Sequence, residues 1–191
     1  MKKDCICEFA DKNLSEKRKI HTEGVRKTAA ILAERFGADP EKADIAALCH
    51  DIYRGKTVDE INNYVNNIGL DKKYINNPNL AHGKIAAYIM ENELGICDED
   101  ILNAVKYHTT GRAHMSMLEK IIFVADAIEP GRAYPGVEEI RKAATYDIDL
   151  AMLISLNGTI EFLKANKAPL IDRDTVEARD QLEKERGINE Q

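Results

Sequence analysis

The residues of this chain that are best suited to do chemistry are four of its five histidines and two aspartates. Each lies three or four residues from apolar residues of its own segment, a spacing that places it on the apolar face of a helix. The six residues are His21, His50, Asp51, His82, His108 and Asp126. A single histidine in such a position is usually a hydrogen-bonded core residue, but six inward-facing polar groups would each cost several kcal/mol of desolvation if left unpaired. A divalent cation removes that cost, so the set predicts a metal site in the core.

The His50-Asp51 dipeptide is the sharpest local signal in the set. Adjacent helical residues diverge by about 100°, so the pair suits a metal ion held at a helix end between neighbouring helices. The predicted ligands are His21, His50, Asp51 and Asp126. His82 and His108 either bind a second ion, with Asp51 as the bridge, or contact phosphate oxygens or protonate a leaving group. With no cysteine in the set, the ion is expected to be iron, manganese, zinc or a similar first-row metal that generates hydroxide from water near neutral pH.

Helices must position these residues, because the hydrophobic spacing is helical along nearly the whole chain. We expect a long helix over residues 16–36 that ends at Gly37, and a second helix that follows the N-cap Asp39 and continues through Asp51. The second helix is apolar almost all round, which indicates a central and buried position. Further helices are expected over residues 80–93, 100–108, 117–128, 137–145, 150–166 and 175–186, and the fold class is all-α.

Three local patterns mark where other helices should begin. Thr57-x-x-Glu60 and Ser116-x-x-Glu119 have the form of capping boxes, in which a hydroxyl and a carboxylate each bind a backbone amide of the first turn. Asp174 is expected to open the last helix.

The chain is expected to form one domain, because it contains no internal repeat, low-complexity segment or Pro/Ser linker. We divide it into a lead-in over residues 1–15, a metal-binding helical core over residues 16–132, and C-terminal helices over residues 133–191 that pack on the same core. A chain of 191 residues is long enough to bury such a core.

Composition excludes several classes of function. The net charge of −6 at pH 7 gives no overall attraction for nucleic acid, so a phosphate ligand would need local arginines or metal ions. The apolar stretches are too short to cross a bilayer and no export signal is visible, so we expect a cytoplasmic protein without a membrane partner. Cys5 and Cys7 could hold a metal or form a redox pair, although exposed thiols at a ragged terminus are the favoured interpretation.

The order of the chemical residues resembles that of the HD-domain phosphohydrolase superfamily, whose minimal pattern is a histidine, a His-Asp pair and a later aspartate. The matching residues here are His21, His50, Asp51 and Asp126. His82 and His108 resemble the extended form of that site.

Several stretches narrow the resemblance to the YqeK-type bacterial proteins of that superfamily, over residues 18–179. They are His82-Gly83-Lys84, His108-Thr109-Thr110-Gly111-Arg112, residues 118–126, and Ile128-Glu129-Pro130-Gly131-Arg132. The segment Asp172-Arg173-Asp174-Thr175 departs from the pattern, since a His-Pro pair would be expected before the threonine.

The resemblance implies an HD-domain helical bundle with a metal site in its core, and an iron enzyme that hydrolyses diadenosine tetraphosphate symmetrically to two ADP. It favours one iron ion, with His82 and His108 on the substrate, over two ions, while manganese and zinc also suit the ligands. A related HD nucleotidase or a (p)ppGpp-type hydrolase is the alternative enzyme. A metal-containing nucleotide sensor without turnover is disfavoured, because a sensor needs no open coordination position. A dimer is an open alternative to a monomer.

Candidate substrate contacts lie near the metal ligands in the sequence. Arg54 follows the His-Asp pair by one turn and either binds a phosphate bidentately or lies solvated in a loop. Thr109 and Thr110 follow a histidine at a predicted helix end, where they either hold phosphate or only cap the helix. Arg132 is interpreted as a phosphate clamp, mainly because of the resemblance.

The resemblance also places a nucleotide contact near the C-terminus, at Asp172, Arg173 and Thr175. On sequence alone this segment could equally be a polar turn that caps the final helix. Lys84 and Arg112 lie near the site in the sequence but could face solvent, and His114 is assigned to the surface.

Overall fold

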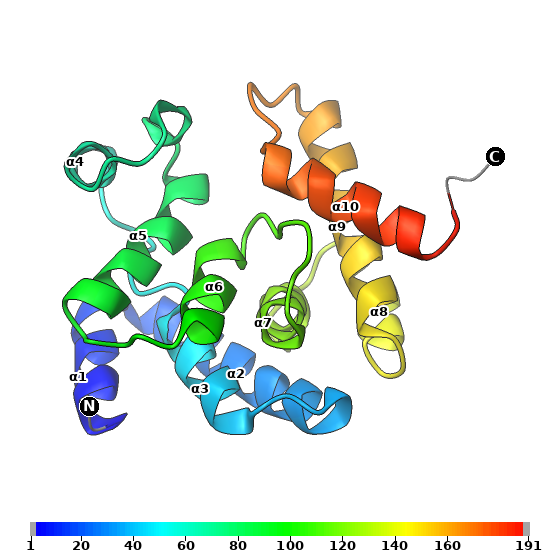
Figure 1. The fold of residues 1–191 in the computed structure, drawn as a ribbon, viewed down its shortest axis with the longest axis horizontal. Helices are drawn as coiled ribbons and strands as arrows, with labels where there is room; N and C mark the ends of the chain where they lie inside the picture. Colours follow the sequence, from blue (N-terminus) through cyan, green and yellow to red (C-terminus); the bar gives the residue numbers. More distant parts are fainter. Residues whose placement is uncertain (1–2, 189–191) are drawn as a thin grey trace.

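The computed structural model describes residues 3–188 and shows an all-helical protein, as predicted (Figure 1). Within that range it contains ten α-helices, one short 3-10 turn and no strand. The elements are α1 (Lys3–Asn13), α2 (Glu16–Phe36), α3 (Pro40–Cys49), α4 (Val58–Asn67), η1 (Lys72–Tyr74), α5 (Pro78–Asn92), α6 (Glu99–Tyr107), α7 (Met117–Ile128), α8 (Val137–Ala143), α9 (Ile148–Ala165) and α10 (Arg173–Glu185).

The limits of α2 and α7 and the start of α3 agree with the sequence, because the capping signals are local. α2 begins after Ser15, which caps its first turn, and ends at Gly37, whose φ of 73° is left-handed and favours glycine. α3 opens on the N-cap Asp39, as predicted, but it ends at Cys49, two residues before the predicted end at Asp51, with His50 as its C-cap residue. α7 spans the predicted residues 117–128.

Only one of the two predicted capping boxes is complete. The hydroxyl of Thr57 and the carboxylate of Glu60 each bind a backbone amide, as the sequence indicated. At the start of α7, Ser116 caps the Glu119 amide, but the Glu119 carboxylate lies 2.6 Å from the guanidinium of Arg112 instead. Glu119 is only 1% exposed, and a buried carboxylate is stabilised more by a guanidinium than by a single amide.

The last helix begins two residues earlier than predicted. Asp172, and not Asp174, is the N-cap residue of α10, and its side chain accepts a hydrogen bond from the Asp174 amide. Asp172 also lies 3.1 Å from Nζ of Lys73, which holds it in the capping position from outside its own segment.

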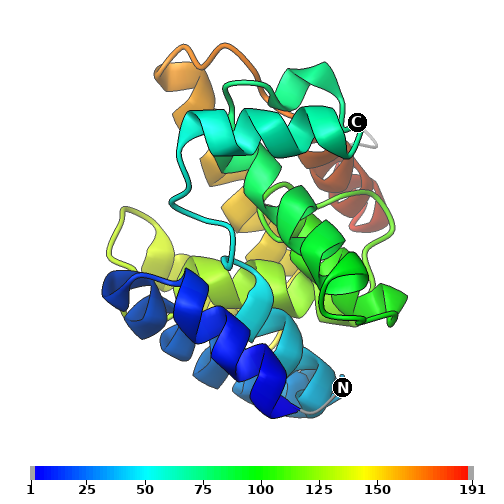
Figure 2. The same cartoon turned by 90° about the vertical axis from the view of Figure 1, so that its left-hand side faces the viewer.

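The segment expected only as a lead-in forms helix α1, which the sequence analysis did not predict. Its apolar face buries Ile6 and Ala10, and Leu14 follows directly after the helix and is also buried. α1 packs against α3 at the outside of the molecule (Figure 2).

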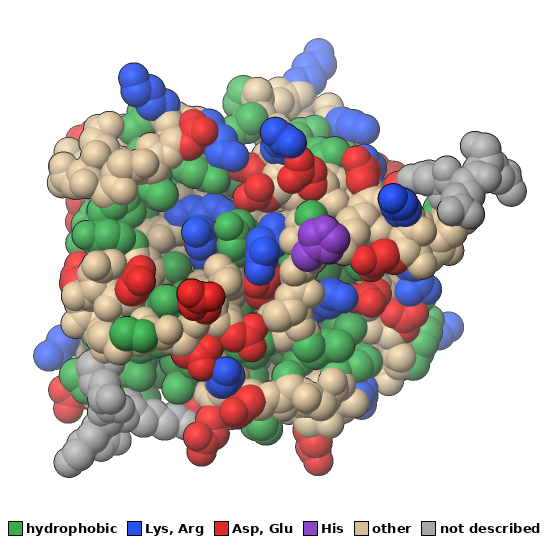
Figure 3. Space-filling model, viewed as in Figure 1, with side chains coloured by type: hydrophobic (Ala, Val, Ile, Leu, Met, Phe, Trp, Pro, Cys, Tyr) green, Lys and Arg blue, Asp and Glu red, His purple; other side chains and the backbone are tan. Residues whose placement is uncertain are grey.

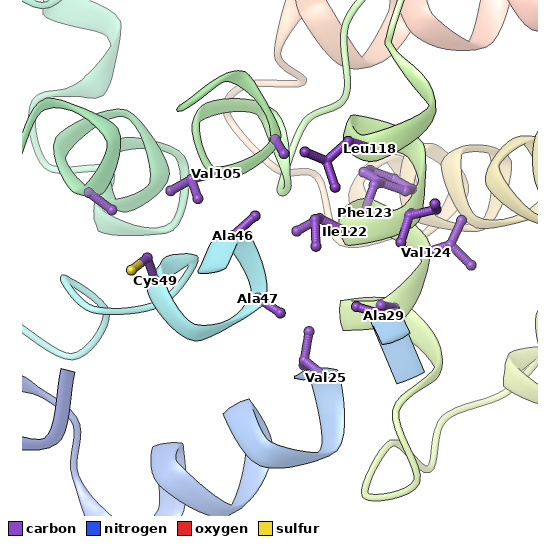
Figure 4. Close-up of a cluster of buried hydrophobic side chains, with 14 of the residues drawn as sticks. Val25, Ala29, Ala46, Ala47, Cys49, Val105, Leu118, Ile122, Phe123 and Val124 are labelled. Atoms are coloured by element: carbon purple, nitrogen blue, oxygen red, sulfur yellow. The ribbon is translucent and has the colours of Figure 1, made fainter. Parts of the chain in front are cut away.

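Helix α3 lies at the centre of the core, as its apolar sequence predicted. It packs against α1, α2, α6 and α7. Ala43, Ala46 and Ala47 are fully buried, and such small side chains let neighbouring helices approach closely. Figure 4 shows Ala46 and Ala47 among apolar side chains of α2, α6 and α7. The C-terminal end of α3, which carries the His-Asp pair, is therefore held between several helices.

The C-terminal helices continue this core. α9 packs against α7, α8 and α10, and in Figure 1 α9 and α10 lie across α7 from α4 and α5. Met152, Leu153 and Leu156 of α9 are buried in the same hydrophobic cluster as α3. The organisation as one domain stays a prediction.

Acidic and basic side chains are interspersed on the face of the molecule shown in Figure 3. The large exposed hydrophobic residues come from different helices, such as Ile20 of α2 and Phe162 of α9. Among residues 3–188, no helix is both long and apolar enough to cross a membrane.

Replacing Leu156 by alanine tests whether the C-terminal helices and the core unfold together. Leu156 is 0% exposed, so the cavity should lower the free energy of unfolding by about 2–5 kcal/mol. In a single domain, urea unfolding followed by circular dichroism should remain one transition with a lower midpoint. Phe162→Ala is the control on the same helix and should change stability by less than about 0.5 kcal/mol. Two transitions, of which only one moves in Leu156→Ala, would show two separate units.

Candidate active site

The structure brings the six predicted residues together from five helices. They are His21 on α2, His50 and Asp51 at the end of α3, His82 on α5, His108 at the end of α6 and Asp126 on α7; we call them the His/Asp cluster. His50, His82, His108 and Asp51 are at most 3% exposed. The side chains of His21 and Asp126 are 11% and 21% exposed, so the cluster is accessible on their side.

Asp51 lies between two pairs of imidazoles. Its Oδ2 is 3.7 Å from Nε2 of His21 and 3.5 Å from Nε2 of His50. Its Oδ1 is 3.2 Å from Nε2 of His82 and 3.9 Å from Nε2 of His108. One carboxylate therefore offers one oxygen to each pair.

Asp126 extends the first pair. Its Oδ1 lies 3.0 Å from Nε2 of His21 and 3.9 Å from Nε2 of His50. The cluster thus consists of two donor sets that share one aspartate. The first set is His21, His50, Asp51 and Asp126, and the second set is Asp51, His82 and His108.

All four imidazoles direct Nδ1 away from the cluster toward a hydrogen-bond acceptor. The contacts are His50 to the Ala47 carbonyl (2.7 Å), His108 to the Val105 carbonyl (2.7 Å), His82 to the Pro78 carbonyl (3.1 Å) and His21 to Oε1 of Glu129 (3.1 Å). Carbonyl and carboxylate oxygens only accept, so each Nδ1 carries the proton and each Nε2 keeps a lone pair that faces the cluster.

These lone pairs meet at short distances. Nε2 of His21 lies 3.3 Å from Nε2 of His50, and Nε2 of His82 lies 3.0 Å from Nε2 of His108. Two lone pairs this close repel each other unless a proton or a metal ion lies between them. Imidazole and carboxylate donors suit first-row divalent ions, and metal-bound histidines typically place their second nitrogen on a carbonyl or carboxylate. The residues fit a divalent metal site.

The protonation states within the cluster suit cation binding. Burial by itself would raise the pKa of Asp51, but electrostatic interactions with the surrounding imidazoles outweigh burial and hold that pKa well below its usual range. Burial, reinforced by His82 and His50, lowers the pKa of His108 to about 3. Near pH 7 the carboxyl of Asp51 is ionised and His108 is neutral, which are the forms that bind a cation.

Three guanidinium groups, which we call the arginine rim, contact the cluster. Nη1 of Arg18 is 2.7 Å from Oδ2 of Asp51. Nη1 of Arg54 lies 3.2 Å from Nδ1 and 3.4 Å from Nε2 of His82, and with Nδ1 protonated only Nε2 could accept a hydrogen bond from it. Arg132 forms an ion pair with the Asp126 carboxylate, and its Nε donates to the Asp126 carbonyl at 2.8 Å.

Two members of the arginine rim were expected from the sequence. Arg54 and Arg132 were candidate phosphate contacts, whereas Arg18 was not named. Its signal in the sequence is a position three residues before His21, almost one helical turn away. The side chains of Arg18 and Arg132 are 31% and 35% exposed, so they line the accessible side of the cluster.

Glu129 lies in a stretch that carries the family resemblance, but no role was predicted for it from the sequence. It is 5% exposed, binds Nδ1 of His21 and accepts a hydrogen bond from the Gly131 amide at 2.5 Å. Gly24 makes room for it, because a Cβ built on Gly24 would lie 2.6 Å from Oε2 of Glu129. No local pattern could have revealed a contact between residues 108 positions apart.

The two threonines after His108 point to different places. Oγ1 of Thr109 lies 3.1 Å from Nε2 of His108, at the cluster. Thr110 is buried, and its hydroxyl donates to the Gly111 carbonyl at 2.8 Å. Thr109 therefore lies at the cluster, whereas the Thr110 hydroxyl stabilises the turn that follows α6.

Lys84 and Arg112 are engaged with other partners. Lys84 is 6% exposed, so the solvent-facing alternative is wrong, and its Nζ lies 3.3 Å from Asp174 and 3.9 Å from the centre of the Tyr107 ring. Burial lowers the pKa of Lys84 to about 8. The guanidinium of Arg112 binds the buried Glu119, which accounts for its position.

The predicted C-terminal contacts belong to the start of α10. Asp172 is 2% exposed and pairs with Lys73, whereas Arg173 is exposed and binds Glu177 at 2.5 Å. Thr175 is 4% exposed. Among residues 3–188, no hydrogen bond or ion pair joins these three to the His/Asp cluster, and their contact with a substrate stays a prediction.

The remaining histidine and the cysteines lie elsewhere. His114 is exposed, as predicted, and its Nδ1 is 3.0 Å from Nε2 of Gln181. Cys5 is exposed and Cys7 is half-buried, and both lie on α1 and not in a ragged segment. Cys49 is buried and Cys97 is exposed.

Residues 18–131, which contain the whole His/Asp cluster, match the HD domain family. The chain belongs to the HD-domain family. His50, Asp51, Arg18 and Glu129 all fall within the matched range, and the role of His50 and Asp51 as its His-Asp pair stays a prediction.

Two relatives that match over most of the chain have the same name. The sequence is 46% identical over 158 residues to a symmetrical bis(5'-nucleosyl)-tetraphosphatase from Bacillus subtilis (strain 168), covering 82% of this chain and 85% of that protein. It is 42% identical over 171 residues to a protein of the same name from Halalkalibacterium halodurans, covering 89% and 91%.

The fold also agrees with a solved structure. A predicted HD superfamily hydrolase involved in NAD metabolism, from Clostridium acetobutylicum, matches with a TM-score of 0.90 and 42% identity, covering 97% of this chain and 98% of that one. The HD-domain helical bundle expected from the sequence is thereby confirmed.

Replacing Gly24 by alanine should weaken metal binding by this HD domain. The added methyl group would displace the Glu129 carboxylate from Nδ1 of His21, and losing such an outer contact typically costs about 10- to 100-fold in metal affinity. Titration with Mn²⁺ by calorimetry measures the change. Gly158→Ala is the control, because its Cβ would meet nothing within 4 Å. Equal affinities in Gly24→Ala and the wild type would contradict this role for Glu129.

Proposed function

We propose that this HD-domain protein is a metal-dependent hydrolase that cleaves diadenosine tetraphosphate into two molecules of ADP. The observation that carries the proposal is a buried aspartate shared by two donor sets, with three guanidinium groups around them. Metal ions and guanidinium groups both bind phosphate oxygens, so the combination suits a polyphosphate substrate. The names of relatives that are 46% and 42% identical support the dinucleoside tetraphosphate class.

Two divalent ions suit the donor sets better than one. Asp51 directs one oxygen to each set and can bridge two ions. With a single ion in the first set, the Nε2 atoms of His82 and His108 would still face each other at 3.0 Å. This argument favours two ions over the single ion that the sequence resemblance suggested. We propose iron as the metal, because the donors suit it and the sequence resembles iron enzymes, while manganese and zinc share these donors.

The proposed chemistry divides between the metal and the protein. A divalent ion held by these donors supplies a Lewis acid that polarises a phosphoryl oxygen and makes water nucleophilic near neutral pH. The hydrogen bonds at Nδ1 hold the four rings in the tautomer and orientation that present Nε2. The hydroxyl of Thr109, next to His108, is placed to donate to an oxygen of a bound phosphate.

The arginine rim would bind the phosphate groups of the substrate. Arg132 contacts the first donor set and Arg54 contacts the second, with Asp51 between the sets. A tetraphosphate bound by both arginines would have its central bridge near Asp51, with one nucleoside diphosphate on each side. This arrangement favours symmetrical cleavage, in which guanidinium groups stabilise the negative charge on both halves.

Hydrolysis in ¹⁸O-labelled water tests the reaction and its symmetry. Metal-loaded protein should convert diadenosine tetraphosphate to ADP alone, with the label in one of the two molecules formed, as read by chromatography and mass spectrometry. AMP together with ATP would show attack at a different bridge. Phosphate released from a mononucleotide would show a nucleotidase, and pyrophosphate released from (p)ppGpp would show that class of hydrolase. Binding of the tetraphosphate without turnover would show a sensor.

Metal counting tests the two-ion arrangement. Wild-type protein equilibrated with Mn²⁺ and then passed through a desalting column should retain two ions per chain by mass spectrometry of the metal. His82→Ala should retain one, because the first donor set stays complete. His114→Ala, at the surface, is the control and should retain two. One ion per chain in both the wild type and His82→Ala would instead support a single-ion site with His82 on the substrate.

A further inference from the structure

A turn of five residues at the end of α7 places two side chains in contact with the His/Asp cluster. It begins at Ile128, the last residue of α7, and runs to Arg132, with a hydrogen bond from the Arg132 amide to the Glu129 carbonyl at 2.9 Å. Glu129 from this turn binds Nδ1 of His21, and Arg132 binds Asp126. The position of the turn therefore sets the orientation of one imidazole and of one guanidinium group.

Arg141 of α8 holds this turn from the opposite side. Its Nε donates to the Ile128 carbonyl at 3.0 Å, and its Nη2 donates to the Glu129 carbonyl at 2.9 Å and the Arg132 carbonyl at 2.8 Å. One guanidinium group thus binds both ends of the turn. Its Nη1 binds the Glu138 carboxylate at 2.5 Å, which fixes the plane of the group.

The number of bonds distinguishes Arg141 from an ordinary basic residue near a helix end. A cation at a C-terminus commonly satisfies one free carbonyl of that helix. Arg35 is an example in this protein, because its Nη1 donates to a single carbonyl, that of Ala144 after α8, at 3.2 Å. Arg141 instead binds three carbonyls, that of Ile128 at the end of α7 and those of Glu129 and Arg132 after it. The rigid fork of a guanidinium makes such a set of hydrogen bonds directional.

We propose that Arg141 is a positioning residue for the metal centre, which fixes the 128–132 turn so that Glu129 orients His21 and Arg132 faces the cluster. The inference rests on the metal site of the proposed function but not on the identity of the substrate. Arg141 acts through the turn, since the cluster residue His21 is bound by Glu129 and Asp126 by Arg132. Removing the guanidinium should loosen the ring of His21 while leaving all ligands of both donor sets in the chain.

Metal binding by Arg141→Gln tests this role. We expect the affinity for Mn²⁺ to fall about tenfold, as for other outer contacts of metal ligands. The visible absorption spectrum of the Co²⁺-loaded protein should change as well, because the geometry at His21 changes. Arg35→Gln is the matched control, since it also removes an arginine-to-carbonyl bond between helices. It should leave both the affinity and the spectrum unchanged.

A double-mutant cycle with Glu129→Gln separates positioning from general stabilisation. If Arg141 acts through Glu129, adding Arg141→Gln to Glu129→Gln should weaken Mn²⁺ binding much less than it does in the wild type. Wild-type affinity in Arg141→Gln, or fully additive losses in the double variant, would overturn the proposal.

Arg141→Lys covers the case in which Arg141→Gln does not fold. A lysine keeps the positive charge but cannot reproduce the planar fork, so an intermediate loss of affinity is expected, and wild-type affinity and spectrum would overturn the proposal. Failure of the wild-type protein to bind Mn²⁺ or Co²⁺ would be a failure of the proposed metal site itself, and this titration detects it separately.

Discussion

The structure depends on burying four imidazole rings around the Asp51 carboxylate without leaving any ring nitrogen unsatisfied. Each ring satisfies its Nδ1 proton on a carbonyl or carboxylate and keeps its Nε2 lone pair toward the cluster. The Nε2 atoms then meet in two pairs, 3.3 Å and 3.0 Å apart, which is unfavourable without positive charge between them. The helices that surround the cluster thus hold an arrangement that a cation between the Nε2 atoms would stabilise.

Three of the four rings satisfy Nδ1 with a backbone carbonyl three or four residues earlier in the chain. The last carbonyls of an α-helix have no amide partner, and His50 and His108 are the C-cap residues of α3 and α6. Each ring binds the carbonyl three residues before it at 2.7 Å, so one bond satisfies the helix end and aims the ring. His82 uses a carbonyl of its own helix in a similar way, at 3.1 Å. Among the four rings, only His21 has its acceptor, Glu129, in a distant segment. The orientation of His21 therefore depends on the position of the turn at the end of α7.

Charge is distributed so that the site can attract a polyanion although the chain carries a net charge of −6. Arg18, Arg54 and Arg132 lie against a cluster that has two carboxylates of its own, and divalent ions would add further positive charge there. With divalent ions bound, the local charge at the accessible side would be positive, opposite in sign to the net charge of the chain. On the face shown in Figure 3, acidic and basic side chains are interspersed.

The sequence by itself determined the all-helical class, the limits of α2 and α7, the start of α3, and the six members of the cluster, because periodicity and caps depend on a few neighbouring residues. Only the tertiary structure decided that Glu119 leaves its capping box for Arg112, and that Lys84 is buried. It also decided which groups support the cluster. Glu129 and Arg18 reach their partners from 108 and 33 residues away, and such contacts form only once helices have packed, so no local spacing encodes them.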